Sequence, residues 1–173
     1  GKTTRFFQQD LSNSGAMFIN SSELVHDYTK YYILYKLFKP DMQRSLVIGG
    51  GAYSIPKALL ASSSSAQVDV SEIEPSLYTL GKQYFNAPET PRMKTYIQDG
   101  RRFLHDTKKP YDLIYSDVYY SIYSIPSHFT TKEFFQLAKN KLSQEGVFIA
   151  NIIGSFSRQQ PSLVFSEMKT FQS

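Results

Sequence analysis

From residue 45 onward, short apolar segments that favour strands alternate with longer segments that favour helices. The predicted strands are residues 45–48, 67–73, 94–98, 112–117 and 146–153. The predicted helices between and after them are residues 55–61, 75–85, 100–104, 130–142 and 161–171. Alternating strands and helices form βαβ units, which build a mainly parallel sheet with helices on both faces. The pattern therefore predicts an α/β protein with a doubly wound sheet.

The residues before this alternation follow a different pattern. Two short strands are predicted at residues 5–10 and 16–20, and the turn-rich residues between them indicate a hairpin. A single helix is predicted at residues 23–38, because Leu24 and several tyrosines recur at spacings of three and four. We therefore expect residues 1–22 to form an N-terminal β-hairpin segment that precedes the main domain.

The composition removes several classes of site and partner. No apolar run approaches the roughly 18 residues that a transmembrane helix needs, so we expect a soluble, cytoplasmic domain without a membrane segment. The absence of cysteine excludes disulfides, thiolate metal sites and cysteine nucleophiles. His26, His105 and His128 are too dispersed to predict a metal site. The net charge of +4 arises from scattered lysines and arginines, so no nucleic-acid-binding face is expected.

Two motifs at the ends of the first two predicted strands suit a nucleoside. Gly49, Gly50 and Gly51 permit a tight turn and let a ligand approach the backbone N–H groups of the next helix. Glu72 follows after 72 − 51 = 21 residues, the spacing of the acid that binds ribose hydroxyls in dinucleotide folds. Glycine clusters also form plain tight turns, and Glu72 or Glu74 alone is typical of a surface acid. Their combination at this spacing favours ribose binding.

Two further acids follow the third and fourth predicted strands. Asp99 can accept a hydrogen bond from the exocyclic amine of adenine, and Gly100 lets the base lie close to the backbone. An Asp-Gly pair alone, however, is a common turn. Asp117 ends the fourth strand, whereas Asp112 at its other end is expected to be structural or solvated. Parallel strands present their carboxyl ends at one edge of the sheet. We therefore expect Glu72, Asp99 and Asp117 to converge on one cleft.

Four segments resemble, in the same order, motifs of the spermidine synthase (polyamine aminopropyltransferase) family. They are VIGGG at 47–51, VDVSEIEP at 68–75, DGRRFL at 99–104, and YDLIYSD at 111–117 followed by HFTTKEFF at 128–135. The resemblance covers most of the chain and implies that residues 23–173 form a Rossmann-like, methyltransferase-type catalytic domain. The implied substrate is a sulfonium nucleoside, either S-adenosylmethionine or its decarboxylated form, with no further cofactor.

The resemblance also implies roles for the strand-end residues. Glu72 is the residue that would bind ribose, and Asp99 and Gly100 would bind adenine. Asp117 would be the acid beside the reacting centre, which in the family helps to deprotonate the attacking amine. The family's donor is decarboxylated S-adenosylmethionine, and its by-product is 5′-methylthioadenosine.

Several positions depart from the family pattern. Ala52 stands where the family usually has an aspartate that holds the donor's ammonium group. Tyr120 replaces the second acid of the family's D-x-x-D loop, which holds the acceptor amine. The family's Tyr-His-Glu corresponds to Tyr28, Thr29 and Lys30, so that a base replaces an acid. Because a site for a polyamine needs carboxylates, these changes argue against a standard spermidine synthase.

The less acidic pocket that these changes predict suits intact S-adenosylmethionine. The leading hypothesis is a lyase, in which the ligand's own carboxylate expels methylthioadenosine and forms homoserine lactone, an intramolecular step that needs mainly orientation. Tyr28 and Lys30 would contact this ligand, and the rings of Tyr119, Tyr120 and Tyr123 would stabilise the sulfonium or else form a packed aromatic loop.

Three alternatives to the lyase stay open. The first is aminopropyl transfer to a diamine or polyamine, the second is a non-catalytic nucleoside-binding domain, and the third is a methyltransferase. A polyamine as partner and a homo-oligomer are left open as well.

Overall fold

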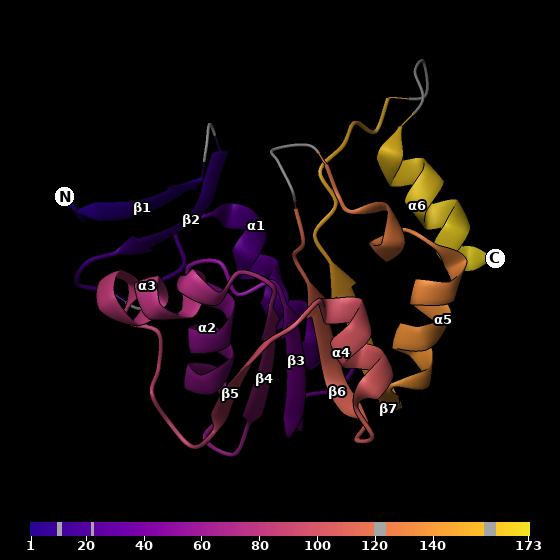
Figure 1. Ribbon diagram of the computed structural model, residues 1–173, viewed down its shortest axis with the longest axis horizontal. Coiled ribbons are helices and arrows are strands. Elements are labelled where there is room, and N and C mark those ends of the chain that lie inside the picture. The colour runs from indigo at the N-terminus through magenta and orange to yellow at the C-terminus, as the bar shows by residue number, and fades with distance from the viewer. Residues whose placement is uncertain (10–11, 22, 120–123, 158–161) are drawn as a thin grey trace.

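A five-stranded parallel sheet forms the centre of the computed structural model, which describes residues 1–9, 12–21, 23–119, 124–157 and 162–173 (Figure 1). The strands are β3 (Arg44–Ile48), β4 (Gln67–Glu72), β5 (Met93–Ile97), β6 (Tyr111–Ser116) and β7 (Leu142–Ala150). Their spatial order is β5-β4-β3-β6-β7, and every pairing is parallel. The chain first adds β4 and β5 on one side of β3 and then adds β6 and β7 on the other side. The strand order therefore reverses between β3 and β6, and ligands of such sheets bind at this switch point. This arrangement confirms the predicted fold class.

Helices cover both faces of the sheet because its buried strands carry apolar side chains on both sides. The helices are α2 (Ser54–Ser62), α3 (Pro75–Phe85), α4 (Gly100–Asp106), α5 (Lys132–Asn140) and α6 (Leu163–Gln172), with a short 3-10 turn, η2 (Ser127–Phe129). Val47 and Tyr115 pack in the core with α2, whereas Ile48 and Ile114 pack on the other face with α4 and α5. Figure 1 shows α2 and α3 on one side of the view and α4, α5 and α6 on the other. Within the described ranges, no helix has the length and apolar character needed to cross a lipid bilayer.

The predicted hairpin is present and packs onto the turn that follows β3. It consists of β1 (Thr4–Gln9) and β2 (Ser12–Phe18), which pair antiparallel. Met17 of β2 packs against Ala52 and Phe85, and the Ser54 hydroxyl donates a hydrogen bond to the Ala16 carbonyl at 3.2 Å. The hairpin therefore covers the carboxyl edge of the sheet beside β3.

The prediction of one helix at residues 23–38 is wrong. The segment contains one turn of α-helix, α1 (Asp27–Lys30), followed by a 3-10 helix, η1 (Tyr31–Leu37). Side chains on the inner face recur every three residues, since Thr29 and Tyr35 are buried and Tyr32 packs against the core. A spacing of three fits the 3-10 helix, in which residues i and i+3 lie on one face.

Asp112 fastens three strands at the amino-terminal edge of the sheet. Its Oδ2 accepts hydrogen bonds from the backbone N–H groups of Gln43 and Arg44 at 2.9 and 3.0 Å, and its Oδ1 accepts one from the Ser143 hydroxyl at 2.5 Å. Burial raises the pKa of Asp112, but these three hydrogen bonds outweigh it and hold the pKa below its usual value. Asp112 was expected to be either structural or solvated, and these hydrogen bonds show that it is structural.

We predict that Asp112→Ala lowers the free energy of unfolding by about 1–3 kcal/mol, because it leaves the backbone N–H groups of Gln43 and Arg44 without this acceptor. Urea denaturation measures the change, and Lys109→Ala at an exposed site, with an effect within about 0.5 kcal/mol, is the control. The folded pKa of Asp112 is lowered, so its contribution is present above the unfolded pKa of about 3.9 and is lost as pH falls through the folded value. Equal stabilities of the two variants at pH 7 would contradict the proposed strand fastening.

Candidate active site

A cavity with a volume of about 630 Å³ lies at the carboxyl edge of the sheet. This volume is within the usual range for small-molecule sites. We call it the main cavity. The predicted site residues that line it are Gly49, Gly50, Gly51, Glu72, Asp99, Gly100, Asp117, Tyr28 and Tyr119. The expected convergence of Glu72, Asp99 and Asp117 on one cavity is therefore present, while Tyr120 and Tyr123 lie outside the described residues.

The glycine loop after β3 adopts backbone conformations that favour glycine. Gly49 has φ 92° and Gly51 has φ 49°, both in the left-handed region. A Cβ atom on Gly49 would lie 2.3 Å from the carbonyl oxygen of Asp117, which is far closer than any real contact. Gly49 therefore allows the loop and the strand end of β6 to touch.

Glu72 holds the glycine loop through its carboxylate. Its Oε2 accepts hydrogen bonds from the backbone N–H groups of Gly50 at 2.7 Å and Gly51 at 3.4 Å, and its Oε1 accepts one from Glu74 at 2.8 Å. A carboxylate offers about four acceptor positions, so these three bonds leave capacity for a ribose hydroxyl. Ribose binding by Glu72 stays a prediction, and the loop-holding role is an addition to it.

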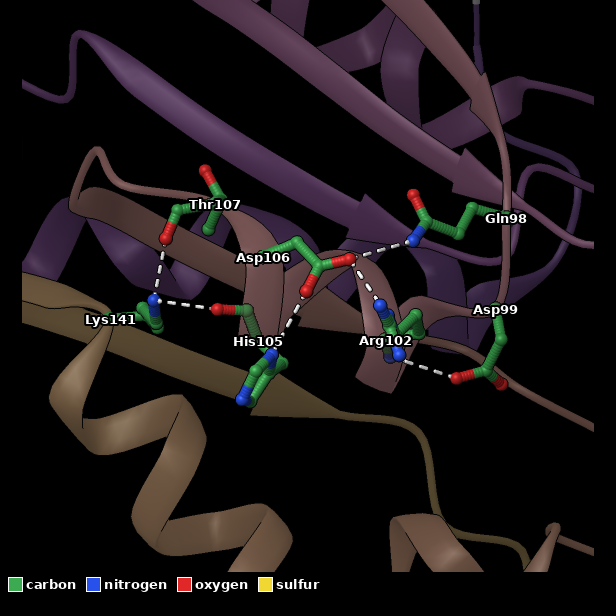
Figure 2. A network of polar contacts seen from close by, with 7 residues as sticks. All are labelled: Gln98, Asp99, Arg102, His105, Asp106, Thr107 and Lys141. Carbon is green, nitrogen blue, oxygen red and sulfur yellow. Dashed lines mark hydrogen bonds and ion pairs between the residues drawn. The ribbon is translucent and has the colours of Figure 1, made fainter.

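Asp99 is the N-cap of α4, and this fixes its position. Its Oδ1 accepts a hydrogen bond from the Arg102 backbone N–H at 2.9 Å. Figure 2 shows the contacts that hold the rest of the helix: Asp106 binds Gln98 and the Arg102 side chain, and Lys141 binds the carbonyl oxygens of His105 and Thr107. The other oxygen of Asp99, Oδ2, lies 3.0 Å from His128 Nε2 on the wall of the main cavity.

Gly100 has a packing role beyond the one expected from the sequence. A Cβ atom on Gly100 would lie 2.1 Å from Cγ2 of Ile48 and 3.4 Å from the Phe129 ring. The absence of a side chain therefore lets α4 approach β3 closely, whether or not a base lies over this position.

Asp117 is partly buried, and each of its oxygens has a donor. Oδ1 accepts a hydrogen bond from Asn151 Nδ2 at 2.9 Å, and Oδ2 accepts one from the Tyr28 hydroxyl at 3.4 Å. Burial raises the pKa of Asp117 above its ordinary value, and these two hydrogen bonds offset part of that rise. Burial and the neighbouring Asp117 charge raise the pKa of Tyr28 far above 10, so that its hydroxyl stays a donor.

Asn151 was not predicted as a site residue, because the fifth strand was predicted to continue to residue 153, whereas β7 ends at Ala150. It directly follows β7, and its backbone N–H extends the pairing with β6 by donating to the Ser116 carbonyl at 2.9 Å. The rule that polar residues at strand ends share one edge of a parallel sheet applies to it as it does to Asp117.

The hydroxyl of Tyr119 forms hydrogen bonds with the backbone that follows β7, so it holds this segment in position. It donates to the Asn151 carbonyl at 2.9 Å and accepts from the Ile153 N–H at 2.7 Å. Burial is the main cause that raises the pKa of Tyr119 to about 12. The contact between its ring and a sulfonium stays a prediction.

The structure does not bring Lys30 into the main cavity. Its Nζ forms an ion pair with Asp27 at 2.8 Å, and its side chain is 47% exposed. Successive residues of a helix are rotated by about 100°, so Tyr28 and Lys30 project in nearly opposite directions. Among the described residues that line the cavity, the carboxylates are Glu72, Glu74, Asp99 and Asp117, and the only groups able to carry positive charge are His26 and His128. The cavity is therefore acidic, and the lysine expected at it from the sequence does not contribute to its charge.

The hairpin explains why a small residue stands at position 52. Ala52 is buried beneath β2, and a Cβ atom on Gly15 would lie 2.5 Å from the Ala52 methyl group. A longer side chain at this position would have to avoid the hairpin and point into the main cavity, which Ala52 also lines.

Comparison with known proteins places this geometry in a family. Residues 29–168 match the spermine/spermidine synthase domain. A polyamine aminopropyltransferase of Vibrio vulnificus is 31% identical over 127 residues, which are 72% of this chain and 42% of the relative. Another, from Sulfurisphaera tokodaii, is 26% identical over 157 residues, which are 87% of this chain and 51% of the relative. This chain thus spans about half the length of these curated relatives.

Solved structures show the same fold in two kinds of protein. A probable spermidine synthase from Corynebacterium glutamicum has a TM-score of 0.72 and 25% identity, over 83% of this chain and 53% of that one. Human methyltransferase-like protein 13, solved in complex with SAH, has a TM-score of 0.61 and 26% identity, over 72% of this chain and 64% of that one. The family match extends over most of the chain and confirms the resemblance seen in the motifs, and so this chain belongs to the spermine/spermidine synthase domain family.

Proposed function

We propose that this chain carries the catalytic domain of an aminopropyltransferase, which moves the aminopropyl group of decarboxylated S-adenosylmethionine to an amine. The acidity of the main cavity is the observation that carries this proposal. Four carboxylates line it, and no lysine or arginine does among the described residues. The decarboxylated donor and the amine are both cations, which carboxylates attract. The names of the relatives, polyamine aminopropyltransferases, favour the same reaction.

The lyase hypothesis loses its support. Neither the family match nor the curated relatives favour it. The carboxylate of intact S-adenosylmethionine would need a cationic partner, and Lys30, which the hypothesis supplied for this purpose, is bound to Asp27 at the surface. Aminopropyl transfer, the alternative weighed against it, fits the cavity better.

The proposed reaction is a displacement at the carbon beside the sulfonium. Adenine lies at Asp99 and ribose at Glu72, so the sulfonium points toward Asp117. The amine nitrogen attacks the methylene carbon, a C–N bond forms, and the electron pair of the broken C–S bond passes to sulfur, which releases methylthioadenosine. Asp117 takes the proton that the amine must lose, and a raised pKa makes this carboxylate a stronger base than an exposed aspartate.

Substrate identity provides the first test. We expect methylthioadenosine to form when the protein receives decarboxylated S-adenosylmethionine and an amine, and not when it receives S-adenosylmethionine alone. Mass spectrometry of the products measures both. Methylthioadenosine from S-adenosylmethionine without amine would restore the lyase hypothesis, and S-adenosylhomocysteine would indicate methyl transfer, which the likeness to methyltransferase-like protein 13 makes worth measuring.

Replacement of the base provides the second test. We predict that Asp117→Asn slows methylthioadenosine release by about 10²–10⁴-fold, the usual loss for a general base. Its affinity for methylthioadenosine, measured by calorimetry, should change little because the side chain keeps its size. Asp41→Asn on the surface is the matched control. An unchanged rate in Asp117→Asn would remove the carboxylate from the mechanism, and binding without turnover in the parent protein would support the non-catalytic alternative.

The pH profile provides the third test. Asp117 acts as a base only when deprotonated, so the rate falls as pH drops through its raised pKa. Tyr28→Phe removes a hydrogen bond that lowers this pKa, and Asn151→Ala removes the shorter one. We predict that the acidic limb of kcat/KM moves to higher pH in both variants, and further in Asn151→Ala than in Tyr28→Phe.

Tyr32→Phe is the control for this pH profile, because it removes a hydroxyl that binds the Ala58 carbonyl away from the main cavity. Its acidic limb should coincide with that of the parent protein. Movement of the limb to lower pH in Asn151→Ala would refute Asp117 as the titrating group.

A further inference from the structure

Helix α6 carries a carboxylate on its inward face. Its buried residues are Val164 and Glu167, and Phe171 on the same face packs against Phe148 of β7. Glu167 is only 5% exposed. A buried carboxylate normally has a hydrogen-bond donor or a cation beside it. No residue in the described part of the chain supplies either to Glu167.

Glu167 lines a second, smaller cavity that adjoins the main one. This side cavity has a volume of about 20 Å³ and shares Val118, Phe129 and Asn151 with the lining of the main cavity. Asn151 therefore lies on the boundary, since its amide nitrogen binds Asp117 while the residue also lines the side cavity. Glu167 is the only ionisable side chain among the described residues of this lining.

The close approach of α6 keeps Glu167 at this place. A Cβ atom on Gly154 would lie 2.8 Å from Cγ2 of Val164, so the loop after β7 touches the first turn of the helix. Burial raises the pKa of Glu167, and no compensating contact lowers it. A cation beside the carboxylate would supply the missing partner.

We propose that Glu167 binds the far ammonium group of a diamine acceptor whose near nitrogen lies at Asp117, an inference that rests on the proposed function. The side cavity has room for about one group of the size of a water molecule, which suits a primary ammonium. Val118, Ile125 and Phe129 provide apolar walls for the methylene chain between the two nitrogens. The family pattern has a second acid at position 120, where this sequence has a tyrosine. Glu167 on α6 would take the place of that acid.

This arrangement predicts a preference among amines. A diamine satisfies Glu167, whereas a monoamine of the same length leaves a buried acid without its partner. Sites built around a polar partner reject analogues that lack it much more strongly than apolar sites reject a missing methylene. The preference should therefore depend on the charge of Glu167 and not on the volume of its side chain.

The test compares 1,4-diaminobutane with 1-aminobutane as acceptors for decarboxylated S-adenosylmethionine, with methylthioadenosine release as the readout. We expect the ratio of their kcat/KM values to fall at least tenfold in Glu167→Gln, which keeps size and removes charge. The KM of the donor should stay unchanged. Glu133→Gln, at an exposed acid on neighbouring α5, should keep the parent ratio. Equal ratios in the parent protein and Glu167→Gln would overturn the assignment while leaving aminopropyl transfer intact.

A binding measurement separates this inference from the proposed function. If no amine supports methylthioadenosine release, the proposed function fails, and the subsite is then tested by thermal unfolding with methylthioadenosine and either amine present. The diamine should raise the Tm of the parent protein and of Glu133→Gln more than that of Glu167→Gln. Equal shifts in all three proteins would overturn the subsite.

Discussion

The hydrogen bonds between the Glu72 carboxylate and the backbone fix the glycine loop, on which the shape of the main cavity depends. They join the end of β4 to the glycine loop after β3 and to the residue before α3. Since Glu72 is buried, these N–H groups find their acceptor in it and not in water. The loop is therefore already shaped before a ligand arrives, which reduces the ordering that binding must supply. A ribose would meet a carboxylate whose position the backbone has already set.

The other acids of the site are held by equally local means. Asp99 is fixed because it caps α4, and Asp117 is fixed because Asn151 and Tyr28 donate to it. Each of these carboxylates comes from a different strand end, so their proximity follows from the parallel sheet and not from any one segment. Several acids in one cavity repel one another, and cationic ligands relieve that repulsion. The cationic substrates proposed above would therefore complement the charge of the cavity.

The sequence predicted the parts of the molecule that depend on regular spacing. Alternating apolar segments were enough for the sheet, and strand-end positions were enough for Glu72, Asp99 and Asp117. Tyr28 was placed correctly at the main cavity, but Lys30 was not, because helix rotation turns it away.

Residues brought in by tertiary packing could not be found in this way. Glu167 has the spacing of an inward-facing position with Val164 and Phe171, yet only the docked helix reveals that an acid lies there. The 3-10 geometry of η1 was missed because spacings of three and four both fit an α-helix. Ala52 looked like the loss of a ligand group, whereas the hairpin packed over it supplies a steric reason.

The contact between Gly49 and the Asp117 carbonyl has a consequence for how this protein could be altered. With only 2.3 Å available for a Cβ atom, any side chain at position 49 would push the end of β6 before it touched a nucleoside. The proposed donor site and the proposed base would therefore shift together, because the glycine loop and the end of β6 are in direct contact. A redesign of this loop for another ligand would therefore also have to accommodate a displaced Asp117.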